Sequence, residues 1–242
     1  MKKKKIIIAA SLLSLLLIVT GVLAVNKKRK SNSQKELLPQ ENSRPLSLEE
    51  KPFLSLVPQG SAYKLLLTVS KARTEELEYE LNYELENGLT RGITGKIKLE
   101  NGEGKKDLLL GSCSSGTCKY DEDAQGGELI IGLKEGNKIR SFTAPFKILN
   151  SGDEEETPDG LLEFTLARQP AGKYILLTGG GLPQEIENKH ILGGPYSFFS
   201  YLQGKISFKK PETGELYFFE EGEWQVVDHY QNLPLGTYLL VK

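Results

Sequence analysis

The chain has 242 residues, of which 38% are hydrophobic and 26% are charged, a composition that excludes collagen-like and wholly disordered proteins. Its formal net charge of −1 hides an asymmetry, because the first thirty residues carry eight of the 31 basic residues and no acidic ones. The rest of the chain therefore has 23 basic against 32 acidic residues, a balance of −9 that repels phosphates, so no nucleic-acid partner is expected.

The strongest signal is a run without charge at residues 6–25. At about 1.5 Å per residue a helix of this length reaches about 30 Å, the thickness of a bilayer core, so residues 1–30 are predicted to form a signal anchor with one transmembrane helix. Basic residues flank both ends, so the positive-inside rule does not orient the segment. A basic start followed directly by an apolar run is typical of a secretory signal, which places the rest outside the cytoplasm. Two alternatives stay open: cleavage near Ala24, giving a secreted protein, and a C-terminus facing inward.

Residues 31–51 are mostly polar and are predicted to form a flexible tether, because they cannot bury enough apolar surface to fold. From there to residue 150 apolar and polar residues alternate, most clearly at 77–85, as half-buried strands require. Turn signals such as Asn87-Gly88 separate the strands. The pattern predicts an antiparallel β-sandwich at 52–150. Its predicted strands are 53–57, 63–69, 77–85, 93–99, 108–113, 118–121, 129–133 and 139–148.

In number, length and alternation, these strands resemble immunoglobulin-like and fibronectin type III-like modules of bacterial or archaeal membrane-anchored surface proteins. The resemblance is architectural and covers residues 52–150. The stretch has no tryptophan, and its two cysteines are too close in sequence to bridge opposite sheets. The resemblance implies a module that binds or scaffolds outside the cell.

Cys113 and Cys118 are the only cysteines of the chain. Four residues with a glycine at Gly116 suit a hairpin tip, so a disulfide across the two strands is expected in an oxidising compartment. The closed loop is short, and the loop-entropy model gives roughly 2 kcal/mol, enough to fix a hairpin locally. The alternatives are a zinc half-site, a redox pair and unpaired thiols.

Residues 151–160 combine acidic residues with Pro and Gly and are predicted to be an acidic linker, with calcium binding as a weaker alternative. Residues 161–242 again alternate and predict a second β-rich domain. Its predicted strands are 161–166, 174–177, 196–201, 205–208, 215–220, 223–227 and 237–241.

The second domain has more aromatic residues than one face of a small sheet must bury. Core packing is the favoured interpretation, but some rings could form a surface for a sugar or a protein. The possible binding aromatics are Tyr196, Phe198, Tyr217 and Trp224.

No catalytic, cofactor or metal site is predicted. The only histidines, His190 and His229, come without a nucleophile motif, and no Gly-Lys-Ser/Thr follows the glycines at 179–181. The fold class expected is therefore all-β, with an N-terminal transmembrane helix followed by two antiparallel β-sandwich-like domains. The expected function is that of a non-catalytic, membrane-anchored extracytoplasmic protein that binds, adheres or scaffolds through an unknown protein or glycan partner. The alternative is an accessory glycan-binding module associated with an envelope enzyme.

Overall fold

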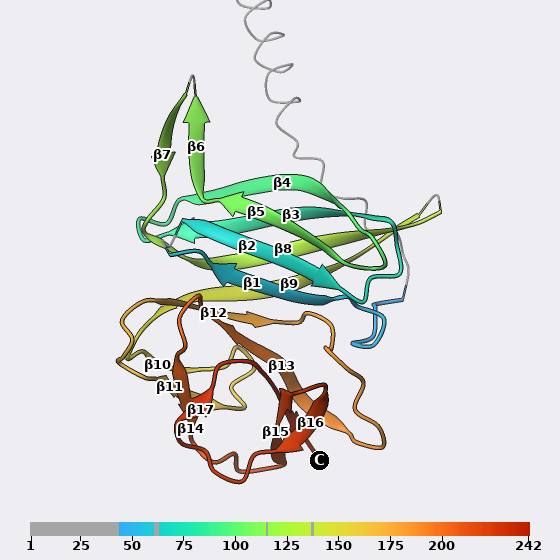
Figure 1. Ribbon diagram of the computed structural model, residues 1–242, viewed down its shortest axis with the longest axis vertical. Coiled ribbons are helices and arrows are strands. Elements are labelled where there is room, and N and C mark those ends of the chain that lie inside the picture. The colour runs from blue at the N-terminus through green and yellow to red at the C-terminus, as the bar shows by residue number, and fades with distance from the viewer. Residues whose placement is uncertain (1–43, 61–62, 115, 137) are drawn as a thin grey trace, which may run out of the picture. The chain divides into compact units, whose positions relative to one another are not determined.

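The computed structural model of the protein describes residues 44–60, 63–114, 116–136 and 138–242. Every regular element in these ranges is a β-strand, and the paired strands run antiparallel (Figure 1). The all-β prediction is confirmed. The predicted membrane segment at 6–25 lies outside the described residues, and within them no helix has the length and apolar character needed to cross a bilayer.

The strands fall into four sheets, of three, four, nine and two strands. Up to residue 150 the strands are β1 (Phe53–Pro58), β2 (Lys64–Ser70), β3 (Glu76–Leu85), β4 (Thr90–Lys98), β5 (Gly104–Leu109), β6 (Gly111–Ser114), β7 (Thr117–Tyr120), β8 (Ala124–Glu135) and β9 (Lys138–Asn150). The others are β10 (Glu154–Glu156), β11 (Glu163–Leu166), β12 (Lys173–Thr178), β13 (Ile191–Phe199), β14 (Lys205–Phe208), β15 (Glu215–Glu220), β16 (Glu223–Val226), β17 (Leu233–Pro234) and β18 (Thr237–Val241).

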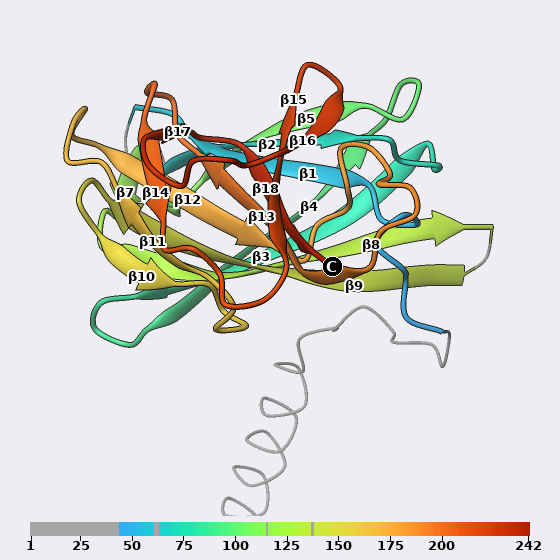
Figure 2. The ribbon, with the colours of Figure 1, turned by 90° about the horizontal axis from the view of Figure 1, so that it is seen from below.

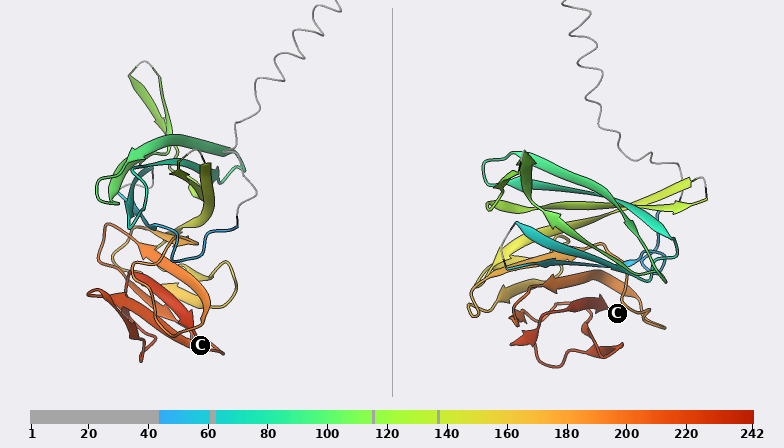
Figure 3. Two further views of the ribbon diagram at one scale, coloured as in Figure 1. Left: turned by 90° about the vertical axis from the view of Figure 1, so that its right-hand side faces the viewer. Right: turned by 45° about the horizontal axis from the view of Figure 1, so that its top comes forward.

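The nine-stranded sheet is the central element of the fold. Its order is β16-β15-β18-β13-β12-β9-β8-β3-β4, so it contains strands from both halves of the chain. The three-stranded sheet β1-β2-β5 and the four-stranded sheet β10-β11-β14-β17 lie on either side of it (Figure 3). The large sheet is thus shared by two sandwich-like arrangements, one with each of the smaller sheets.

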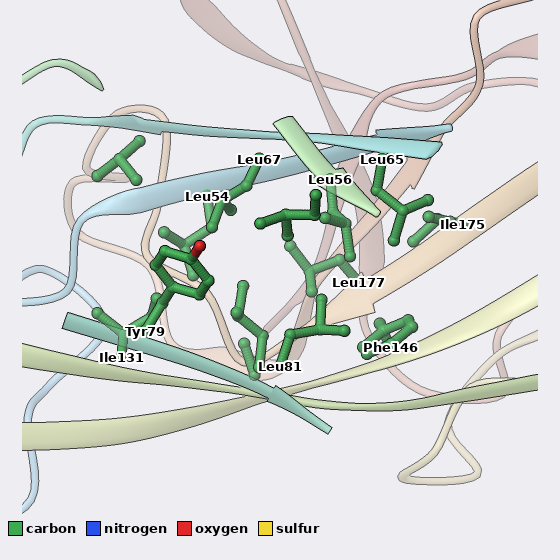
Figure 4. Close-up of a cluster of buried hydrophobic side chains, with 14 of the residues drawn as sticks. Leu54, Leu56, Leu65, Leu67, Tyr79, Leu81, Ile131, Phe146, Ile175 and Leu177 are labelled. Atoms are coloured by element: carbon green, nitrogen blue, oxygen red, sulfur yellow. The ribbon is translucent and has the colours of Figure 1, made fainter. Parts of the chain in front are cut away.

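The first hydrophobic cluster lies between β1-β2-β5 and the part of the large sheet that runs from β3 to β12. Leu56 and Leu67 face Leu81 and Phe146 across the interior of this cluster, and Leu177 of β12 closes one side of it (Figure 4). All five side chains are at most 5% exposed. The alternation recognised at 77–85 has this origin, because every second residue of β3 points into the cluster.

The second cluster lies on the other face of the large sheet, under β10-β11-β14-β17. Strand β12 belongs to both clusters: Ile175 and Leu177 pack into the first, whereas Tyr174 and Leu176 pack into the second. Neighbouring residues of a strand point to opposite faces, so a strand covered on both sides has a continuous apolar run. The Tyr-Ile-Leu-Leu run of β12 has this cause.

The segment predicted to be an acidic linker contains strand β10, which pairs with β11. Just before it, β9 ends at Asn150, and β9 pairs with β12 across this segment. The predicted division into domains 52–150 and 161–242 stays a prediction, and its test is the number of unfolding transitions.

Candidate binding surfaces

The structure places three of the four predicted binding aromatics inside the protein. Tyr196 and Phe198 are each 1% exposed in the second cluster, and Tyr217 is 6% exposed in a third, smaller cluster. The Tyr196 hydroxyl donates to Asp159 Oδ2 at 2.6 Å, and burial together with this carboxylate raises the pKa of Tyr196. These rings are core residues, as the favoured interpretation has it, so the glycan-binding alternative depends on Trp224.

Trp224 is half-buried on β16, at the margin of the third cluster. Its indole N–H donates to the Gln184 carbonyl at 2.8 Å, and its ring meets Phe219 edge-on with centroids 5.2 Å apart. These contacts hold the ring in one position, and part of it stays accessible to solvent.

Strands β6 and β7 form a two-stranded sheet of their own, which we call the disulfide hairpin (Gly111–Tyr120). Cys113 and Cys118 lie directly opposite each other and are bonded, so the disulfide prediction is confirmed. No residue of the hairpin belongs to any of the three hydrophobic clusters of the described chain. In Figures 1 and 3 the hairpin rises away from the other sheets.

The base of the disulfide hairpin is anchored firmly. The Tyr120 ring stacks on Tyr63 at 4.3 Å, and next to it Asp121 is 3% exposed. Asp121 Oδ2 accepts a hydrogen bond from the Tyr83 hydroxyl at 2.7 Å and lies 3.4 Å from Arg91 Nη1. Burial, reinforced by the Asp121 carboxylate, raises the pKa of Tyr83. The exposed hairpin therefore stands on a fixed base.

A shallow apolar pocket of about 310 Å³ opens on the outer side of β8 and β9. Gly126 and Gly127 are among its lining residues, and they allow the neighbouring backbones to approach closely, since a Cβ at Gly127 would collide with the Asn82 carbonyl oxygen. The charged residues along it are Glu84 and Lys147, and Lys147 Nζ is engaged with Glu155 Oε2 at 2.7 Å. The pocket can hold a small apolar group, but it gathers no set of groups that would activate one.

The remaining candidate motifs have structural explanations. Gly181 lies against the backbone of residues 51–52 and donates to the Pro52 carbonyl at 3.0 Å, while Lys51 Nζ donates to the Gly179 carbonyl at 2.9 Å. The glycines at 179–181 thus allow two backbone segments to approach closely. In the described part of the chain, no group of three or more His, Cys, Asp or Glu side chains is arranged to hold a metal ion.

Comparison of the chain with known protein families, with curated proteins and with solved structures found no match. The resemblance to immunoglobulin-like modules therefore stays a prediction, and the functional argument rests on the two exposed features, the disulfide hairpin and the margin of the large sheet at β16.

Proposed function

We propose that this chain is a non-catalytic, membrane-anchored binding protein of the cell envelope, which holds its β-domains outside the cytoplasm and contacts a partner through the disulfide hairpin. The uncharged run at 6–25 supports the anchor, because twenty such residues suit a bilayer core. The bond between Cys113 and Cys118 supports the location, because disulfides persist in oxidising compartments.

The observation that carries the proposal is that a covalent bond joins the two strands of the disulfide hairpin although most of their described residues are exposed. An isolated two-stranded hairpin is at best marginally stable in water. This hairpin adds nothing to the hydrophobic clusters, and its residues Ser112, Ser114, Thr117 and Lys119 are exposed. The disulfide therefore orders a surface that contributes little to the fold, as expected of a contact element.

The location is tested by thiol labelling of cells with a sealed plasma membrane and no outer layers. After mild reduction, a membrane-impermeant maleimide should label Cys113 and Cys118, and without reduction it should label neither. Labelling only after lysis, or free thiols in a soluble fraction, would exclude an extracytoplasmic position.

The contact is tested with a photo-crosslinking residue placed at Thr117, on the disulfide hairpin, and at Thr213, an exposed control position in the loop before β15. We expect one discrete adduct from Thr117 that disappears when Cys113 and Cys118 are both changed to serine, and none from Thr213. Equal adducts from both positions, or none from Thr117, would show that the hairpin is not the contact element.

A further inference from the structure

The large sheet ends in an open edge at β16. Strand β16 pairs only with β15, and no other strand of the described chain lies beside its outer side. The opposite end of the sheet differs, because β4 packs next to β5. In Figure 2 the β15–β16 hairpin, drawn in red, lies at the margin of the molecule.

The backbone groups on this open edge can be identified. Val227 N donates to Leu216 O at 2.8 Å, and bonded and non-bonded pairs alternate along an antiparallel ladder. Glu221 and Gly222 form a two-residue turn in which both φ angles are positive. In a turn of this kind the residue before the turn and the residue after it form a hydrogen-bonded pair. The N–H and C=O groups of Trp224 and Val226 therefore point away from β15, toward solvent.

The same two residues carry the apolar side chains of the edge. Val226 is 46% exposed, and Trp224 is half-buried on the same face. A strand added to this edge would place every second side chain beside them, where cross-strand apolar pairs are stabilising. Backbone hydrogen bonds would supply affinity, and this apolar pair would fix the register.

Charge indicates what kind of strand fits. Between residues 211 and 234 the chain has six acidic residues and no lysine or arginine. A basic group in contact with this face is Lys189, whose Nζ lies 5.5 Å from the centroid of the Tyr217 ring on the neighbouring strand β15. Two copies of the edge would bring like charges together, whereas an extended basic segment would be attracted.

We propose that the outer edge of β16 is a second interaction surface, which binds an extended peptide segment of alternating apolar and basic residues as an added β-strand. This surface is separate from the disulfide hairpin, so the two can be lost independently.

The chain has a single tryptophan, Trp224, which reports directly from this edge. The probe is a synthetic eight-residue peptide of alternating valine and lysine, titrated into the full-length protein in nanodiscs of zwitterionic lipid. We expect a saturable change in tryptophan fluorescence that weakens as salt is added. The same peptide with glutamate in place of lysine, and one N-methylated on alternate residues, should not bind.

Two protein variants separate the edge from other sites. Val226→Pro removes an outward N–H without touching the ladder to β15, and should weaken the peptide about 2- to 10-fold, since one net hydrogen bond is lost. The matched control Val226→Thr keeps the N–H and should bind nearly as wild type. Changing Glu221 and Glu223 to lysine should weaken binding about three-fold or more.

Three results would overturn the proposal: equal affinity of Val226→Pro and Val226→Thr for the peptide, equal binding of the N-methylated peptide, or a fluorescence change that follows protein concentration without peptide. The last would mean that a second copy occupies the edge. Retention of Thr117 crosslinks in Val226→Pro would confirm that the two surfaces are independent, and loss of those crosslinks would show that they are one site.

Discussion

Neighbouring leucines on β12 provide a direct test of how the two halves of the protein are coupled. Leu176 is 1% exposed in the second cluster, and Leu177 is 2% exposed in the first. Truncation of a fully buried leucine to alanine removes its transfer free energy and leaves a cavity, so each variant should lose about 2–5 kcal/mol of unfolding free energy. Because both side chains belong to one strand in one continuous sheet, both changes should lower the same transition.

The assay is urea unfolding of the protein and its variants in one detergent, followed by far-UV circular dichroism and by Trp224 fluorescence. Circular dichroism reports on all strands, whereas Trp224 reports from β16 at one end of the large sheet. The two curves should coincide for the wild type, Leu176→Ala and Leu177→Ala, which is the signature of one cooperative unit. The control Leu89→Ala, at a leucine that is 55% exposed, should change the free energy by less than about 0.5 kcal/mol.

The reasoning fails if unfolding has two steps and each variant moves only one of them. In particular, a fluorescence curve that shifts in Leu176→Ala but stays unchanged in Leu177→Ala would mean that the halves unfold separately. The predicted division into two domains would then hold thermodynamically despite the shared sheet.

Three further predictions concern stability. Gly127→Ala should cost at least about 2 kcal/mol in urea unfolding, because the new Cβ would meet the Asn82 carbonyl in the neighbouring strand, and a wild-type midpoint would refute this. Asp121→Ala should cost about 1–3 kcal/mol because the buried Tyr83 hydroxyl loses the carboxylate to which it donates, and a double-mutant cycle with Tyr83→Phe should show a coupling above about 1 kcal/mol rather than additivity. The pKa of Tyr196 is raised above its ordinary 10.0 in the folded state, so the free energy of unfolding should fall as pH rises above that value. Chemical unfolding at about pH 9 and about pH 11 should show a smaller fall for Tyr196→Phe than for the wild type. Equal falls in the two proteins would contradict the assignment.

Local signals in the sequence were enough to predict most of the strands. The residues predicted at 215–220 and 237–241 form β15 and β18 with the same bounds. A half-buried strand leaves a period of two in its own sequence, so no knowledge of its partner is needed to find it. The Cys113–Cys118 bond was predictable for the same reason, because a hairpin brings together residues that are close in the chain.

Elements whose pairing is distant in the sequence could not be predicted in this way. Strand β10 consists of three glutamates, and its strand character comes only from its pairing with β11. The first part of β13, at residues 191–195, was missed because it contains two glycines and a proline and is shaped by irregular pairing with β18. Composition indicated a linker at 151–160 and no strand was predicted at 191–195, and tertiary context overrode local preference in both places.

The candidate surfaces depended even more on topology. Alternation in the sequence showed that aromatic residues such as Tyr196 and Tyr217 lie on strands. It did not show that other parts of the chain cover both faces of those strands. Conversely, nothing local distinguishes β16 from an interior strand. Its open edge follows from the order of nine strands, which only the fold reveals.

The acidic residues around β16 have two consequences that belong together. Exposed strand edges invite pairing between copies of a protein, and charged side chains on the edge oppose it. Glu220, Glu221 and Glu223 sit at the tip of the β15–β16 hairpin, so a copy approaching edge to edge meets the same charges. The repulsion acts on like charge alone and leaves the Trp224 and Val226 backbone groups accessible. An edge protected in this way excludes its own copies while it remains open to a basic strand, so protection from aggregation and selection of a partner have one electrostatic cause.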